Sequence, residues 1–173
     1  AYQHISGSLS ESLALTNPGT SRALTYNYVG GGAWERANVG SGTLDFTYDP
    51  FTYGVVTPDA ALARSGTGVY AVSLVGARAM GSQYAMAGSG GLQVDFGTGR
   101  IESSGTLSTI DTNGNFKGIG VFFGSAPLSS TANSFSGSFA MDDGTRFTGG
   151  WQGRFYGPSS NEVGATWQMS AVD

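Results

Sequence analysis

The chain has 173 residues, enough for one ordinary domain or a domain with a small appendage. It has 29 glycines and no cysteine, which excludes disulfides, cysteine-ligated metals and thiol catalysis. A net charge of −4, with eight scattered basic residues, gives no basic stripe for nucleic acid or for an anionic membrane, and no apolar run is long enough for a membrane-spanning helix.

The only histidine, His4, comes first in chain order. An imidazole is a common axial ligand of haem iron, so haem is a candidate ligand. The alternative is a surface residue near a loose terminus, and this interpretation is favoured. A single histidine cannot form a bis-histidine site, so a tyrosine would have to supply any second ligand.

The first third of the chain is rich in tyrosine and in turn-forming residues, and it predicts several short strands. We expect the run Gly30–Gly32 and Pro50 to interrupt them. The aromatic residues here either pack strand faces on a core or form a binding surface, because Tyr and Trp offer large rigid contacts with polar tips. Packing is favoured; if the rings are exposed, a partner site is expected here. The aromatic group comprises Tyr26, Tyr28, Trp34, Phe46, Tyr48, Phe51 and Tyr53.

A short helix of at most two turns is predicted between Thr57 and Gly66. Thr57 would cap it, Pro58 would take the first helical position and Gly66 would end it. The composition changes at this point. We therefore predict an N-terminal β-rich region at residues 1–65 and a C-terminal β-barrel at residues 66–173, together forming one compact unit.

From Gly66 onward, alternation of large and small residues predicts about seven strands with short connections. Asp111–Asn115 and Asp142–Gly144 are expected to be hairpin turns. Rings and glycines share the same strand faces, as a tight barrel requires. The sequence thus predicts an all-β fold: a small antiparallel barrel of about eight strands with an N-terminal handle-like extension. A β-sandwich remains an alternative to the barrel. The predicted strands are 68–76, 84–96, 100–108, 116–124, 134–140, 147–155 and 162–169.

Near the C-terminus, the stretch "GRFYGPSSNEVGATW" has the composition of a tight corner. Pro158 suits the first position of a helical turn, and glycines on both sides permit sharp bends. Glu162 lies near this turn, and its carboxylate could accept backbone N–H groups. We expect a structural motif that closes one barrel end, formed by Phe155, Tyr156, Gly157, Pro158, Glu162 and Gly164.

This stretch closely resembles the closing motif of the β-barrel domain of transferrin-binding protein B and its relatives. Val94-Asp95-Phe96, with the turn after it, resembles another strand of that family, and the similarity runs from about Tyr26 to Met169. The resemblance implies an exported protein, secreted or on the outer-membrane surface of a Gram-negative bacterium. It also implies capture of a host iron-carrying or haem protein, haem itself or another ligand, or contact with an outer-membrane receptor.

Catalysis and metal binding find little support in the sequence. One histidine near the terminus is not readily placed in a triad, and His–carboxylate clusters are absent. We therefore expect a non-enzymatic binding protein. Two alternatives stay open: a self-associating surface or matrix protein, and a carrier that holds a small ligand inside the barrel. The candidate binding residues are His4, Tyr26, Tyr28, Trp34, Tyr48 and Tyr53.

Overall fold

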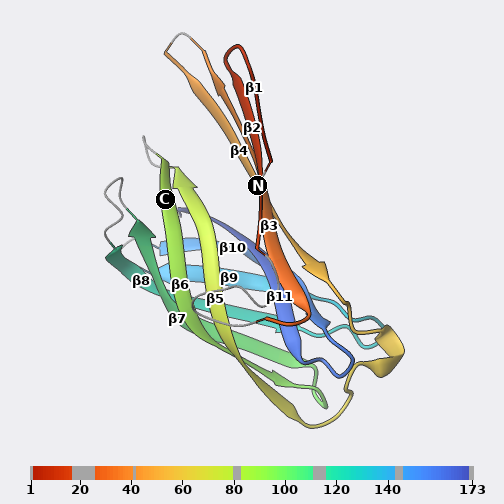
Figure 1. Cartoon of the computed structure of the whole chain (residues 1–173). Helices are drawn as coiled ribbons and strands as arrows, with labels where there is room; N and C mark the ends of the chain where they lie inside the picture. The colour runs from red at the N-terminus through yellow and green to blue at the C-terminus, as the bar shows by residue number, and fades with distance from the viewer. Residues whose placement is uncertain are drawn as a thin grey trace.

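A computed structural model describes residues 2–16, 26–40, 42–79, 83–110, 116–142 and 146–171. The described residues form two antiparallel sheets (Figure 1). The first, which we call the handle sheet, has the strand order β1-β2-β3-β4 and rises away from the rest of the molecule. Its strands are β1 (Tyr2–Ser6), β2 (Leu9–Leu15), β3 (Val29–Val39) and β4 (Leu44–Gly54).

The second sheet is the predicted barrel. Its order, β11-β10-β9-β8-β7-β6-β5, follows the chain without a crossover, so every neighbouring pair is joined by a hairpin-type connection. All seven predicted strands are confirmed, and the all-β, barrel-plus-handle fold class is confirmed with them. The strands are β5 (Thr67–Ala79), β6 (Gln83–Asp95), β7 (Arg100–Ile110), β8 (Phe116–Pro127), β9 (Phe135–Asp142), β10 (Arg146–Tyr156) and β11 (Glu162–Ala171).

The barrel curls until its two edge strands, β5 and β11, lie close together. Their backbones are not paired in the part of the chain that the structure describes. Side chains bridge them instead: the Trp167 ring of β11 lies over Gly76 of β5, and the Tyr70 hydroxyl donates to the Ser160 carbonyl at 2.7 Å. The barrel is therefore nearly closed, with a seam that side chains fill.

Alternation along the strands explains the barrel interior. On β10, Trp151 and Phe155 are buried, while Gln152 and Arg154 between them face solvent. Rings fit because glycines face them. A Cβ on Gly105, for example, would lie 2.6 Å from the ring of Phe122. The rings pack into one cluster with aliphatic side chains, which weighs against a small ligand in this part of the barrel. Its buried rings are Phe96, Phe122, Phe135, Phe139, Trp151 and Phe155.

The expectation that Gly30–Gly32 and Pro50 interrupt the handle strands is wrong. β3 and β4 pair continuously over eleven residues each, and both features lie inside them. Pro50 is tolerated because β4 is an edge strand, where a missing N–H leaves no ladder bond unmade. The glycines are tolerated because rings of the neighbouring strand cover two of them, Gly30 and Gly32.

The predicted helix shrinks to a single 3-10 turn, Asp59–Ala61. Thr57 does not cap it. Its side chain is buried and donates to the carbonyl of Gly157, and Pro58 occupies the cap position. Residues 55–66 instead run between the two sheets. None of the helical residues in the described ranges forms a segment long and apolar enough to cross a membrane.

The turn after β6 is formed as predicted. Asp95 accepts N–H bonds from Thr98 at 3.0 Å and from Gly97 at 2.9 Å, and these bonds lower the pKa of its carboxyl group. Of the two predicted hairpin turns, 111–115 and most of 142–144 lie outside the described residues. A register shift between β7 and β8 at Leu107/Ser108 interrupts the alternation predicted for β8.

Candidate functional site

The handle sheet has one face toward the barrel and one face away from it. Val29 and Thr52 lie on the barrel side, where a Cβ added to Gly164 would lie 2.9 Å from the Val29 side chain and 3.0 Å from that of Thr52. The Thr52 hydroxyl and the Tyr156 hydroxyl are 2.8 Å apart and share a hydrogen bond. The strand register then places the alternate residues on the opposite side of the sheet, which we call the outer face.

The outer face carries a group of apolar side chains that we call the apolar platform. Three of them are strongly exposed for residues of their size: Tyr2 at 53%, Leu15 at 49% and Phe51 at 36%. The strand register places all members on the same face of four hydrogen-bonded strands. The platform comprises Tyr2, Leu13, Leu15, Trp34, Phe51 and Tyr53.

Glycines make the platform flat. The Tyr53 ring lies across Gly30 and the Phe51 ring across Gly32, so close that a Cβ on either glycine would meet the ring at 2.5 Å. The Tyr53 hydroxyl also donates to the carbonyl of Thr16 on the neighbouring segment. These contacts hold the rings flat against the sheet. The result is a rigid aromatic surface on a scaffold that need not rearrange to present it.

One row of polar residues crosses the outer face beyond the platform. His4, Glu11 and Arg36 lie side by side on three adjacent strands. The Glu11 carboxylate is 3.7 Å from His4 Nδ1 and 3.8 Å from Arg36 Nε. His4 is half exposed on the edge strand β1, so its imidazole is accessible, with a carboxylate as its charged neighbour.

The structure separates the candidate binding residues into three places. His4, Trp34 and Tyr53 share the outer face, and the Trp34 ring stacks on Tyr2 with centroids 6.2 Å apart. Tyr48 lies on the opposite face beside Phe46. Burial raises the pKa of Tyr48, and the nearby charge of Glu35 raises it further.

Tyr26 and Tyr28 lie at the junction between the two sheets, just before β3. Burial raises the pKa of Tyr26; a hydrogen bond to the backbone of Ser73 on β5 opposes this rise, and the charge of Glu162 on β11 adds to it. Tyr26 is therefore close to both edge strands of the barrel. Tyr28 packs against Gly157, where an added Cβ would lie 2.8 Å from its ring. These two residues are junction residues in the structure.

Glu162 holds the junction together. Its carboxylate accepts backbone N–H bonds from Asn27, Tyr28 and Val29 at 2.7, 2.8 and 2.9 Å. The sequence led us to expect an acceptor for backbone N–H groups of its own turn. The donors instead belong to a segment more than 130 residues away, which no local pattern reveals.

Replacing Glu162 by Gln is expected to loosen this junction without unfolding the barrel. The amide loses the charge and presents an NH2 group to donors, so at least one of the three charge-assisted bonds is lost. Loss of about 1.5 kcal/mol locally corresponds to roughly tenfold faster amide exchange at Asn27–Val29. Hydrogen exchange measures this change in rate. Glu102→Gln, on the exposed surface of β7, is the control. Equal exchange rates at Asn27–Val29 in both variants would contradict the role of Glu162 at the junction.

The rest of the closing motif forms a tight corner. Phe155 and Tyr156 are buried, and Gly157 has a φ of 85°, a conformation that L side chains rarely adopt. Pro158 begins the exposed part of the turn. Gly164 is enclosed by Tyr156, Val29 and Thr52, so this glycine allows the handle sheet to approach β11 closely.

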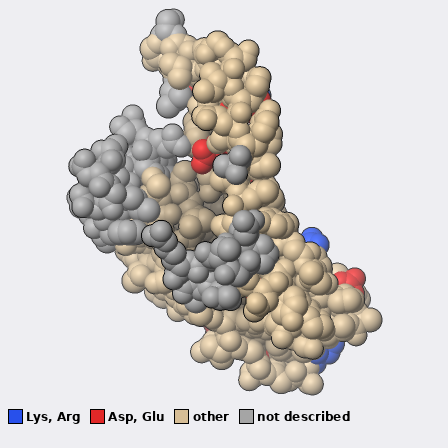
Figure 2. All heavy atoms as spheres, in the orientation of Figure 1, with Lys and Arg blue, Asp and Glu red and all other residues tan. Residues whose placement is uncertain are grey.

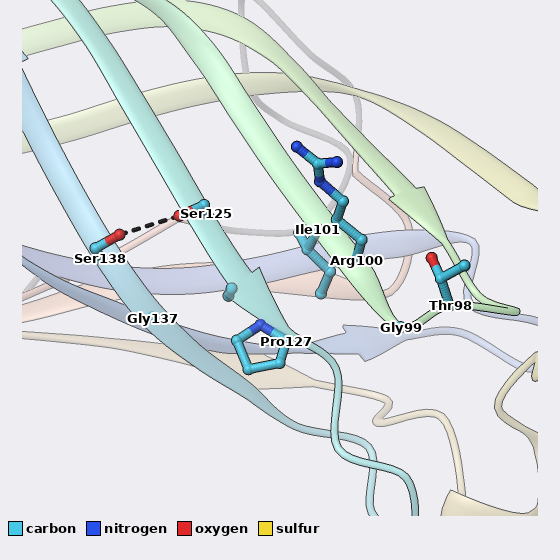
Figure 3. A pocket seen from close by; sticks show the side chains of 9 residues that line it. Thr98, Gly99, Arg100, Ile101, Ser125, Pro127, Gly137 and Ser138 are labelled. Carbon is cyan, nitrogen blue, oxygen red and sulfur yellow. Dashed lines mark hydrogen bonds between the residues drawn. The ribbon is translucent and has the colours of Figure 1, made fainter.

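A second surface feature is a shallow depression of about 430 Å³ where β8 and β9 separate (Figure 3). Its polar groups bind one another. The Ser125 and Ser138 hydroxyls are 3.0 Å apart, and the Arg100 guanidinium pairs with Glu102. Such mutual pairing leaves few polar groups to orient a ligand.

The platform includes residues that the sequence did not single out. Tyr2, Leu13 and Leu15 alternate with polar residues in "YQHIS" and "LSESLAL", and this period-2 pattern was the available signal. Within the described residues, no three His, Cys, Asp or Glu side chains gather as a metal site would require. In the part of the chain that the structure describes, the outer face of the handle sheet thus gathers four aromatic rings into one partly exposed surface.

Comparison with known proteins defines the fold. No family model matches the chain, and no curated protein matches it. Among solved structures, intact Ap-TbpB (N and C lobes) is similar over 96% of this chain, with a TM-score of 0.59 and 16% sequence identity. The chain spans about a third of that protein's length, 34%. The likeness confirms the fold expected from the closing motif: a nearly closed barrel with a handle sheet, as in a TbpB lobe.

Proposed function

We propose that this chain is a non-enzymatic binding module that captures a protein partner on the outer face of its handle sheet. The apolar platform is the observation that carries the proposal. Tyr2, Leu15 and Phe51 are exposed on a rigid sheet, although burying such side chains would be favourable. Contiguous exposed apolar surface of this kind marks interaction sites on soluble proteins.

The composition of the platform suits a protein partner. Aromatic residues, Tyr and Trp above all, dominate the energetic centres of protein interfaces. Four strands about 4.8 Å apart give a platform roughly 15 Å across, the size of an interface centre with a polar rim. The likeness of fold to Ap-TbpB supports a binding role of this class. An exported protein on the surface of a Gram-negative bacterium, with a host iron-carrying protein as partner, is the specific form we propose.

The proposal is tested by immobilising the chain and measuring which proteins it retains. Purified transferrin is the first probe, and host serum with mass spectrometry is the second. We expect Trp34→Ala and Phe51→Ala to abolish retention of a protein that the unaltered chain retains, because each substitution removes a ring of the platform. An absorbance scan of the retained material reads out haem at the same time.

The matched control is Phe123→Ala on the outer surface of β8, where the ring is 56% exposed. It removes an exposed ring of the barrel and leaves the handle sheet unchanged. Retention that is equal in all variants, or that depends on Phe123 alone, would place the contact elsewhere and refute the proposal. A Soret band that disappears in His4→Ala would indicate haem instead of a protein.

A further inference from the structure

The charged side chains of the outer face indicate the chemistry of the partner, which the apolar platform alone does not. Among the handle residues that the structure describes, three carboxylates, Glu11, Asp45 and Asp49, share this face with one guanidinium, Arg36, which gives these residues a net charge of −2 with His4 neutral. Glu11 lies beside both Arg36 and His4. The other two carboxylates, those of Asp45 and Asp49, are exposed on the edge strand β4.

Asp49 lies directly opposite Trp34 across the β3–β4 pair, and Asp45 lies two alternate positions further along the strand. Asp49 therefore adjoins the apolar platform at its β4 edge, and Asp45 lies on the same strand beyond the row of polar residues. In the view of Figure 2, blue basic atoms appear on the lower part of the molecule, and red acidic atoms appear on both the handle and the lower part. Charges at the rim of an interface select partners by complementarity.

We infer that the partner of the outer face is a basic protein surface, with Lys or Arg opposite Asp45 and Asp49 and apolar side chains over the platform; this rests on the proposed function. Lysine or arginine at this rim would also reach the faces of Trp34 and Phe51, which attract cations. A second copy of this chain fits less well, because two outer faces would bring together two net negative surfaces. Carboxylate-bearing ligands are disfavoured for the same reason.

A designed pair of peptides tests the inference. The probe is a cyclised β-hairpin with tryptophan and valine on one face, flanked by lysines; its counterpart has glutamates in place of the lysines. Titration calorimetry at low salt measures affinity, and amide shifts in β1–β4 locate the contact. We expect the lysine hairpin to bind at least tenfold more tightly than the glutamate hairpin, and added salt to weaken it.

Variants separate the inference from the function on which it rests. We expect Asp45→Asn with Asp49→Asn to weaken binding of the lysine hairpin about fivefold and Trp34→Ala at least as much, with Glu102→Gln unchanged. The inference would be overturned if Glu102→Gln weakened binding of the lysine hairpin as much as the double variant does. It would also be overturned if the hairpin did not bind at all, or if the chain formed dimers that depend on Trp34. If retention of transferrin or a serum protein depends on Trp34 but not on the two aspartates, the inference fails and the proposed function stands. If no retention depends on Trp34 or Phe51, the proposed function fails.

Discussion

Phe155→Ala is expected to destabilise the protein by about 3–5 kcal/mol, the usual cost of deleting a buried phenylalanine ring. The Phe155 side chain is 0% exposed. Its ring centroid lies 5.4 Å from that of Phe96, 5.7 Å from Tyr70 and 6.1 Å from Phe135. These neighbours come from different parts of the barrel, so they cannot collapse together into the space that the ring leaves.

Chemical denaturation measures the loss of unfolding free energy. The midpoint of thermal unfolding is expected to fall by roughly 10 °C for a chain of this size. Phe155→Leu, which fills most of the space, is expected to cost much less. Phe123→Ala is the matched control, because it removes the same ring from the solvent side of the same barrel, and a change within about 0.5 kcal/mol is expected. Comparable losses in Phe155→Ala and Phe123→Ala would mean that the interior is not packed around this ring.

The barrel could be predicted because its sequence repeats one local rule. Each strand alternates an inward and an outward residue, and a ring on one strand faces a glycine on the next, as Phe122 faces Gly105. Period-2 alternation is visible in a single sequence. Closure is not, since it depends on how the whole sheet curls. The Trp167 ring over Gly76, which fills the seam, has no local signal.

The handle sheet was harder to predict because its glycines and proline disfavour a strand in isolation but are accommodated in the folded sheet. In isolation, Gly30–Gly32 and Pro50 disfavour a strand. In the sheet, rings of β4 cover Gly30 and Gly32, and the edge position accommodates Pro50. The aromatic group was recognised as a whole, yet the choice between packing and exposure depended on strand register, which places Trp34 and Tyr48 on opposite faces.

Contacts between distant loops are the part that no sequence pattern indicated. Asn133 lies in the connection between β8 and β9, in a run of small polar residues that predicts only a loop. It is nevertheless buried. Its side chain donates to the carbonyls of Thr57 and Phe155 at 2.7 and 2.8 Å and accepts the Phe155 N–H at 2.8 Å. Asn133 thereby ties the segment between the two sheets to the closing end of β10.

Asn133→Ala is accordingly expected to cost about 2–6 kcal/mol, although it removes only a small side chain. The Phe155 N–H and the Thr57 carbonyl would lose these buried partners, and each unsatisfied buried group costs about 1–3 kcal/mol. The Phe155 carbonyl would keep its bond from the Thr57 N–H. Chemical denaturation compares this variant with Asn38→Ala, which removes an exposed side-chain bond on the handle sheet and should change stability by less than about 0.5 kcal/mol. Equal losses would mean that water replaces Asn133 without cost, and that the loop does not hold the handle connection in place.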